Sequence, residues 1–248
     1  MSKIILFSKK DPAGRNIARI LRGDFNLSPL EYDKEILYMD ELKVGNVEKE
    51  TDLCIVASRH KSKMGKPSLT AHSPGNFGKA GYGGKSRELG IAPALYLKQA
   101  ITSLYEHKIE GYEVSLEATH HGPTSIEFPM IFVEVGSTEG EWNDLVACRA
   151  VANTIEDLMK MEPERFPVAI GFGGGHYCRK FSQVRDYAVG HICPRYNLHN
   201  LDKEMVEQMI SKTMPIPEFA LVEKKGMGRE KGRILEILKE TELDVVMI

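Results

Sequence analysis

The chain contains short apolar runs that are separated by longer segments with helical spacing. The continuous runs, typical of strands buried on both faces of a sheet, are Lys3–Ser8, Asp52–Ser58, Met130–Val135 and Pro167–Phe172. Tyr112–Thr119 instead alternates apolar and polar residues, as a half-buried strand does. The set of predicted strands is completed by Tyr187–Cys193 and Phe219–Val222.

Apolar residues recur at helical spacing between these strands. The predicted helices are residues 12–22, Ile91–His107, Glu141–Met161, Asp202–Ser211 and Gly228–Lys239. Strands that alternate with helices favour an α/β fold with three layers, α/β/α, around a mostly parallel (mixed) central sheet. The 248 residues contain neither an internal repeat nor a Pro- or Ser-rich linker, so we predict a single domain over residues 1–248.

Composition excludes several classes of protein. With 42% hydrophobic and 27% charged residues, the chain is neither disordered, nor a coiled coil, nor collagen-like. No apolar run approaches the roughly 18 residues of a membrane span, so we expect no membrane partner. The 4 cysteines form no C-x-x-C pair, which predicts reduced thiols in a cytoplasmic protein. A net charge of −2 argues against a general nucleic-acid coat protein.

One segment concentrates positive charge against this near-neutral background. Ser58–Arg87 has 7 basic residues, no acidic residue and 6 glycines, and we predict a basic, Gly-rich functional loop over residues 58–90. Such a concentration suits a phosphate-bearing partner. The candidate contacts are Arg59, Lys61, Lys63, Lys79, Lys85 and Arg87, with Tyr82 available to stack on a base. A solvated, mobile loop is the alternative. A second basic stretch, Lys224–Arg233, is explained nearly as well by a solvated helix start.

Histidines follow several of the predicted strands. They are His60 and His72 in the basic segment, the pair His120 and His121 after Tyr112–Thr119, and His176 after Pro167–Phe172. Strand ends that meet at one edge of a sheet would bring these imidazoles together, and neutral imidazole is a common zinc ligand. Glu117 is the candidate carboxylate, as a ligand or as a base, and Glu134 is a less favoured substitute. The alternative is that each residue is structural.

A glycine cluster precedes the last of these histidines. The main-chain amides of Gly173, Gly174 and Gly175 are candidates to bind an oxyanion or a phosphate. A tight turn without a ligand explains these glycines about as well. The chain has no Gly-x-Ser-x-Gly motif, and Cys178 is the only candidate for thiol chemistry. Water activated by a metal or by histidine is therefore the more economical nucleophile.

Several strings together resemble those of the archaeal and plant type of D-aminoacyl-tRNA deacylase. They are Ser58-Arg-His, Pro67-Ser-Leu-Thr-Ala-His-Ser-Pro-Gly-Asn76, Glu117-Ala-Thr-His-His-Gly-Pro-Thr, Gly173-Gly-Gly-His-Tyr and Gly190-His-Ile-Cys-Pro-Arg-Tyr. The resemblance spans nearly the whole chain. It implies a cytoplasmic monomer without an obligate protein partner, which hydrolyses the ester between a D-amino acid and the acceptor end of tRNA. It also implies two zinc ions per subunit and a fold related to peptidyl-tRNA hydrolases and nucleoside phosphorylases.

The combined interpretation is an ester hydrolase that uses a zinc-bound water as its nucleophile. His60, His72, His120, His121 and His176 form the pool of metal ligands. The predicted catalytic residues are His120, His121, Glu117 and His176. Two other functions stay open at this point. One is a metal-dependent peptidase or nucleoside-processing hydrolase on the same fold, and the other is a non-catalytic RNA-binding module.

Overall fold

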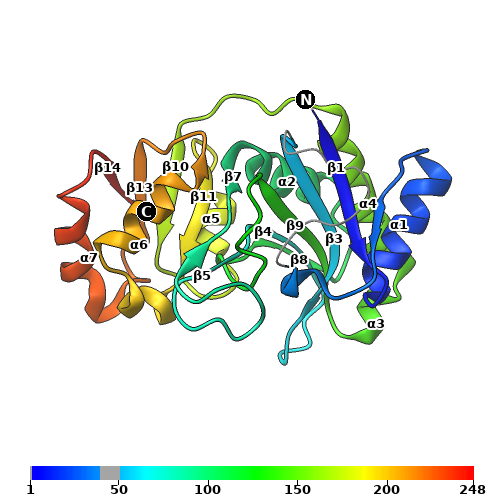
Figure 1. Cartoon of the computed structure of the whole chain (residues 1–248), viewed down its shortest axis with the longest axis horizontal. Coiled ribbons are helices and arrows are strands. Elements are labelled where there is room, and N and C mark those ends of the chain that lie inside the picture. The colour runs from blue at the N-terminus through cyan, green and yellow to red at the C-terminus, as the bar shows by residue number, and fades with distance from the viewer. Residues whose placement is uncertain (1, 40–50) are drawn as a thin grey trace.

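The strands of the chain form two main sheets that lie side by side (Figure 1). The computed structural model describes residues 2–39 and 51–248; residues 1 and 40–50, which the predicted domain includes, lie outside the described residues. The first sheet has 6 strands in the order β2-β1-β3-β9-β4-β8. Their bounds are β1 Lys3–Ser8, β2 Leu30–Tyr32, β3 Leu53–Lys61, β4 Ser68–His72, β8 Glu113–Leu116 and β9 Met130–Ser137.

The second sheet has 4 strands in the order β11-β10-β13-β14, and all its pairs are parallel. These strands are β10 Val168–Phe172, β11 Ala188–Cys193, β13 Phe219–Val222 and β14 Asp244–Met247. Two small pairs accompany the main sheets. Their strands are β5 Gly75–Asn76 with β6 Glu88–Leu89, and β7 Ala92–Pro93 with β12 Thr213–Met214.

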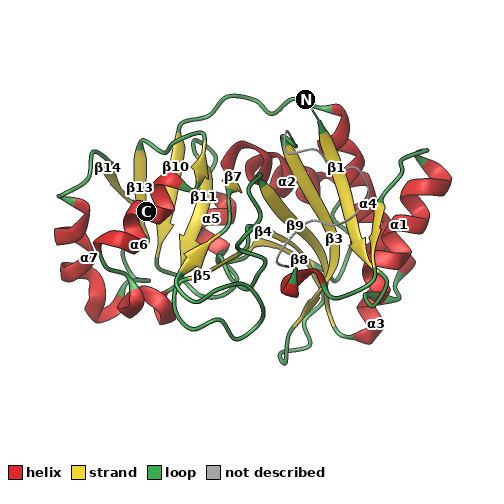
Figure 2. Cartoon of the chain, in the orientation of Figure 1, coloured by secondary structure: helices red, strands yellow, loops and turns green. Residues whose placement is uncertain are grey.

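Helices cover the sheets in layers (Figure 2). The helices are α1 Pro12–Asp24, α2 Ala94–Glu106, α3 Glu139–Trp142, α4 Leu145–Lys160, α5 Arg179–Gln183, α6 Lys203–Ser211 and α7 Lys231–Leu238. The 3-10 turns are η1 Ile36–Tyr38, η2 Arg195–Asn200 and η3 Gly228–Glu230. Helices α1, α2 and α4 share a core with one face of the first sheet, and α6 and α7 pack on the second sheet. In the part of the chain that is described, no helix has the length and apolarity of a membrane span.

The predicted α/β class with a mostly parallel, mixed sheet is confirmed. Only β4 and β9 pair antiparallel in the first sheet; every other pair in it is parallel. The structure adds that the strands divide between two sheets. It also shows that the predicted helix Glu141–Met161 is two helices, because Asp144 caps a new helix by accepting a hydrogen bond from the Val146 amide at 2.9 Å.

Residues 58–90 do not form the single loop that the sequence predicts. Strand β3 continues through Ser58 to Lys61, and Ser68–His72 forms β4, in which every residue is buried. The string Ser-Leu-Thr-Ala-His alternates polar and apolar residues, which is the pattern of a strand. The abundance of glycine and lysine around it conceals that pattern in the sequence.

Candidate metal centre

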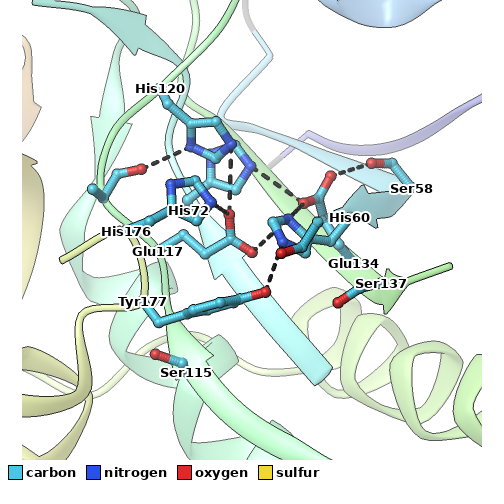
Figure 3. A network of polar contacts seen from close by, with 12 residues as sticks. Ser58, His60, His72, Ser115, Glu117, His120, Glu134, Ser137, His176 and Tyr177 are labelled. Carbon is cyan, nitrogen blue, oxygen red and sulfur yellow. Dashed lines mark hydrogen bonds and ion pairs between the residues drawn. The ribbon is translucent and has the colours of Figure 1, made fainter. Parts of the chain in front are cut away.

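Strand alternation places a set of polar side chains on one face of the first sheet. Ala57 and Val135 belong to the core beneath the helices, so their neighbours Ser58 and Glu134 point to the opposite face. His60 and His72 lie on that same face by the same period of two. These side chains converge with residues from later segments above the sheet (Figure 3). The imidazoles therefore meet on a face of the sheet. The positions of the histidines after strand ends had instead predicted a site at one edge of the sheet.

Glu117 lies at the centre of one half of this cluster. Its Oε1 is 3.0 Å from Nδ1 of His60, and its Oε2 is 2.9 Å from Nε2 of His176 and 3.5 Å from Nε2 of His120. The carboxylate is fully buried, with an exposed side-chain fraction of 0%. The other ring nitrogen of His60, Nε2, lies 2.9 Å from the hydroxyl of Tyr177. One carboxylate thus faces three imidazoles that come from separate parts of the chain.

The other half of the cluster contains three histidines and a second carboxylate. The ring of His72 lies 4.1 Å from that of His120 and 4.8 Å from that of His121, measured between centroids. Glu134 Oε2 is 3.6 Å from Nε2 of His72 and 3.6 Å from Nδ1 of His60, so it connects the two halves. Its other oxygen accepts a short hydrogen bond from the hydroxyl of Ser58.

Main-chain carbonyls orient three of the rings. Nδ1 of His72 lies 3.2 Å from the carbonyl oxygen of Ser73, Nδ1 of His120 lies 2.8 Å from that of Ala118, and Nδ1 of His121 lies 2.6 Å from that of Gly122. A carbonyl oxygen only accepts, so each Nδ1 carries the proton. In a neutral ring Nε2 then keeps its lone pair, which is the arrangement of metal-binding histidines whose other nitrogen is held in place.

Three buried polar atoms of the cluster, both carboxylate oxygens of Glu117 and Nε2 of His72, form no hydrogen bond of good geometry among the described residues. Their nearest polar neighbours are imidazole nitrogens of His60 and His176 beside Glu117, and Oε2 of Glu134 beside His72. An ion held between these ligand atoms would satisfy them. Ligand atoms within 4.8 Å of one another form three groups: His72 with His120 and His121, His60 with Glu117 and His176, and His72 with Glu117 and Glu134. Imidazole nitrogens and carboxylate oxygens are the ligands of catalytic zinc sites, so these residues fit that metal.

The electrostatics of the cluster favour bound positive charge. Burial lowers the pKa of His60, but Glu117 and Glu134 outweigh burial and raise this pKa to about 11. Burial likewise opposes ionisation of Glu134, yet the imidazoles of His60 and His72 that face it lower its pKa to about 2. The pKa of His121 falls to about 4, because burial and the charge of His72 disfavour a proton there. The two carboxylates therefore stay ionised and hold cationic partners.

The structure brings together all the histidines of the predicted ligand pool, and Glu117 with them. Sequence reasoning underrated Glu134, and it missed Tyr177 and Ser58 as partners within the cluster. One signal for Glu134 was present, because it is the only charged residue in the otherwise apolar run Met130–Val135. A buried charge in such a strand requires partners, and this reason alone could have identified it.

The glycine cluster lies beside His176 at the end of β10. The amide of Gly173 donates to the carbonyl oxygen of Cys193 at 2.9 Å, so this amide is occupied by the chain itself. Within the described residues, no acceptor is bonded to the amides of Gly174 and Gly175. Cys178 is buried, and burial raises the pKa of its thiol well above the usual value. A reactive thiolate is therefore disfavoured at this position.

The basic residues predicted to bind phosphates fall into two groups. Arg59, Lys85 and Arg87 pair with Glu35 at 3.0 Å, with Glu88 at 3.4 Å and with Asp202 at 2.7 Å, respectively. Lys61, Lys63 and Lys79 are exposed and have no ion pair among residues 2–39 and 51–248. Only the second group presents uncompensated charge to a partner. Tyr82 is exposed, as a stacking role requires.

The remaining histidines lie outside the cluster. His191 is buried, with Nδ1 at 3.1 Å from the hydroxyl of Thr119 and Nε2 at 3.0 Å from the carbonyl oxygen of Gly90. His107 pairs with Asp157 at 3.0 Å, and His199 is exposed. His191 lies within β11, and its two ring nitrogens are occupied by the chain itself, so it has a structural role.

Comparison with known proteins gives consistent matches. A family model described as D-aminoacyl-tRNA deacylase matches residues 47–246. A curated protein of that name from Cenarchaeum symbiosum is 36% identical, covering 95% of this chain and 96% of the relative. Proteins of the same name from Staphylothermus marinus and Pyrococcus furiosus are 38% and 36% identical, covering 94% and 96% of this chain and 94% and 95% of the relatives.

A solved structure supports the same relationship at the level of the fold. It is the crystal structure of a conserved protein of unknown function, which is 27% identical to this chain. The two structures superpose with a TM-score of 0.89, covering 99% of this chain and 95% of the other. The agreement includes the elements that carry the histidine and glutamate cluster, because it extends over nearly the full length.

Proposed function

This chain belongs to the D-aminoacyl-tRNA deacylase family, and from that premise we propose that it hydrolyses the ester between a D-amino acid and the 3′ end of tRNA. The observation that carries the proposal is the buried cluster itself. Five imidazoles and two carboxylates meet there, and three of their atoms form no hydrogen bond of good geometry among the described residues. Such a cluster is costly to bury unless it serves a bound ion.

We assign the residues of the cluster to two zinc-binding groups. His72, His120 and His121 form one group, and His60, Glu117 and His176 form the other. Glu134 lies between the groups, within 3.6 Å of His60 and of His72. When bound, zinc supplies a Lewis acid that polarises the ester carbonyl and lowers the pKa of water from 15.7 to about 7. The carboxylates and the oriented Nε2 atoms would hold the zinc ion in a fixed position.

The side chains around the cluster suggest how the ester is oriented. His176 has an exposed side-chain fraction of 32%, the largest among the residues that face Glu117, so the ester enters beside it. The amides of Gly174 and Gly175 are the donors proposed to hold the developing oxyanion. The leaving ribose oxygen takes its proton from water or from an imidazole that is not bound to metal. His120, His121, Glu117 and His176 are therefore the proposed catalytic residues.

Lys61, Lys63 and Lys79 are the proposed contacts to tRNA phosphates, because they carry exposed charge without an ion pair in the described part of the chain. Arg59, Lys85 and Arg87 would then support the fold around this surface through their ion pairs. A substrate of this kind places the enzyme where translation occurs, in the cytoplasm. We propose that the monomer is sufficient, since every residue of the cluster comes from one chain.

Matched D- and L-aminoacyl-tRNA distinguish this function from its rivals. We expect rapid loss of the D-aminoacyl ester, slow loss of the L-aminoacyl ester, and an affinity for tRNA that falls steeply with salt. Equal hydrolysis of both esters would contradict a chirality-specific deacylase. Hydrolysis of free peptides or nucleosides at a higher kcat/KM would favour a peptidase or a nucleoside-processing hydrolase. Binding of RNA without any hydrolysis would favour the binding module.

A further inference from the structure

A cavity of about 540 Å³ lies beyond the carboxyl ends of strands in the second sheet, near the histidine cluster. Its lining includes Gly174, Gly175, Arg195, Tyr196, Arg229 and Glu230. The cavity is adjacent to the proposed site, because Tyr196 lines the cavity and its hydroxyl lies 3.4 Å from Nδ1 of His176. A single side chain, Tyr196, thus contacts both the cavity and the cluster.

The position of the cavity in the fold is typical of a ligand site. Gly174 and Gly175 follow β10, Arg195 and Tyr196 follow β11, and Arg229 follows β13. These three strands are parallel neighbours, so all of them end on the same side (Figure 1). In open α/β sheets, ligands bind in the crevice beyond the carboxyl ends of the strands. The volume also falls in the range of about 300–1,000 Å³ that is usual for small-ligand pockets.

The lining carries more positive than negative charge, with Arg195 and Arg229 against Glu230. The side chain of Arg195 has no ion pair or hydrogen bond among the described residues, and it lies directly against Gly228, where a Cβ would come within 2.9 Å of its Nε. Arg229 is 91% exposed and lies 3.3 Å from Glu230, but that carboxylate also pairs with Arg233 at 2.9 Å. Two arginines thus share the cavity with the carboxylate of Glu230, which also pairs with Arg233, and a second carboxylate, that of Glu223, lies against Gly174.

The remaining lining fits the other parts of a nucleotide. The ring of Tyr196 is 52% exposed and offers a surface on which a base can stack. Arginine binds phosphate through two parallel hydrogen bonds. The Lys224–Arg233 stretch, which the proposed catalytic residues do not use, supplies Arg229 to this surface.

We propose that this cavity binds the 3′-terminal nucleotides of the RNA, with Arg195 and Arg229 on phosphate and Tyr196 stacked on a base. The inference rests on the proposed function, because the ester of an aminoacyl-tRNA is attached to the ribose of its last nucleotide. That nucleotide must lie next to the group that is hydrolysed, and this cavity is next to His176.

The test compares wild type with Arg195→Ala and with Arg195→Ala/Arg229→Ala on two substrates. On D-aminoacyl-tRNA we expect KM to rise about tenfold in the single variant and about a hundredfold in the double variant, with kcat within twofold, because a charge-assisted hydrogen bond to phosphate is lost at each step. On D-aminoacyl-adenosine, which has the ester but no phosphate, the variants should match wild type. Arg19→Ala, which lines a separate cavity on α1, is the matched control and should behave as wild type.

Direct binding separates this inference from the proposed function. A 5′-phosphorylated CCA trinucleotide should bind to wild type and to Arg19→Ala, and its affinity should fall about a hundredfold in the double variant. If wild type binds the trinucleotide but hydrolyses no D-aminoacyl-tRNA, the proposed function fails and the nucleotide site stands. Unchanged affinity for the trinucleotide together with an unchanged KM in the double variant would overturn the nucleotide site.

Discussion

His60 and Glu117 come from strands that run in opposite directions, yet Nδ1 of His60 lies 3.0 Å from Oε1 of Glu117. His60 is on β3, and Glu117 directly follows β8. The reversal between them occurs at the antiparallel pair β4–β9, which lies between these strands in the sheet. Because of this one reversal, the carboxyl ends of β3 and β8 lie at opposite ends of the sheet. The side chains of His60 and Glu117 nevertheless reach the same part of the sheet face. The cluster depends on that topology as much as on its side chains.

Replacing His120 or His121 with alanine should abolish deacylation without unfolding the protein. Each ring belongs to the three-histidine group, and loss of a metal-holding residue removes several kcal/mol of transition-state stabilisation. This corresponds to a fall in kcat/KM of about 10³-fold or more. His107→Ala is the matched control, since His107 pairs with Asp157 away from the cluster. Full activity in both cluster variants, with a wild-type circular dichroism spectrum, would refute the site.

Glu134→Gln tests the carboxylate that connects the two halves of the cluster. The substitution keeps the shape of the side chain but removes the negative charge that faces His60 and His72. We expect bound zinc, measured by elemental analysis, to fall below the wild-type ratio and kcat/KM to fall with it. Ser58→Ala removes only the hydroxyl that donates to Glu134, so its effect should lie within about 10–100-fold, as for other residues that support a ligand. A Glu134→Gln enzyme with full zinc content would contradict this role.

The two groups of basic residues should respond differently to salt. Lys61, Lys63 and Lys79 have no ion pair in the described parts of the chain, so replacing all three with alanine should reduce the salt dependence of tRNA affinity. The slope of log K against log salt should become shallower by about 2, at roughly 0.7 per contact with a single strand. Arg59→Ala removes the ion pair with Glu35 and the contact with the Trp142 ring at 5.2 Å. It should lower Tm and leave the slope unchanged; the reverse pattern would contradict the assignment.

His191 should make stability depend on pH. Its pKa in the fold is lowered from 6.5 to about 4 by burial, so between these values the unfolded chain binds the proton more strongly than the folded one. The stabilisation is complete above pH 6.5 and is lost as pH falls toward 4, with a magnitude of about 3 kcal/mol at 1.36 kcal/mol per pH unit. Urea unfolding of the metal-free protein at several pH values measures it. His191→Gln should flatten this part of the curve, and an identical pH slope in both proteins would contradict the assignment.

The sequence alone predicted most of the elements and most of the cluster. Strands such as Val168–Phe172 and Phe219–Val222 lie where their apolar runs indicate, because buried parallel strands have a strong and simple pattern. His60, His72, His120, His121 and His176 were identified by their positions after or within such strands. One such histidine is weak evidence, as His191 shows, but several from separate segments at corresponding positions indicated a common site.

The direction of β4 and the pairing of the charged residues could not be predicted in the same way. Whether β4 runs parallel or antiparallel to its neighbours depends on which strands those neighbours are. The alternation of polar and apolar residues from Ser68 to His72 is compatible with both directions. In the sequence, Arg59 and Arg87 are basic residues of the same segment as Lys61. Their acidic partners, Glu35 and Asp202, are distant in sequence. Local charge therefore overstated the surface available to RNA, since only tertiary contacts distinguish a paired arginine from a free lysine.

The most direct measurement is zinc content together with deacylation of D-aminoacyl-tRNA, before and after chelation, and again after zinc is restored. We predict two equivalents of zinc per chain, from the two histidine-containing groups joined by Glu134. Ester hydrolysis should be lost with the metal and regained with it, while His120→Ala should neither retain full zinc nor recover. A chain that hydrolyses the D-aminoacyl ester at the full rate after exhaustive chelation, with no metal bound, would contradict the account.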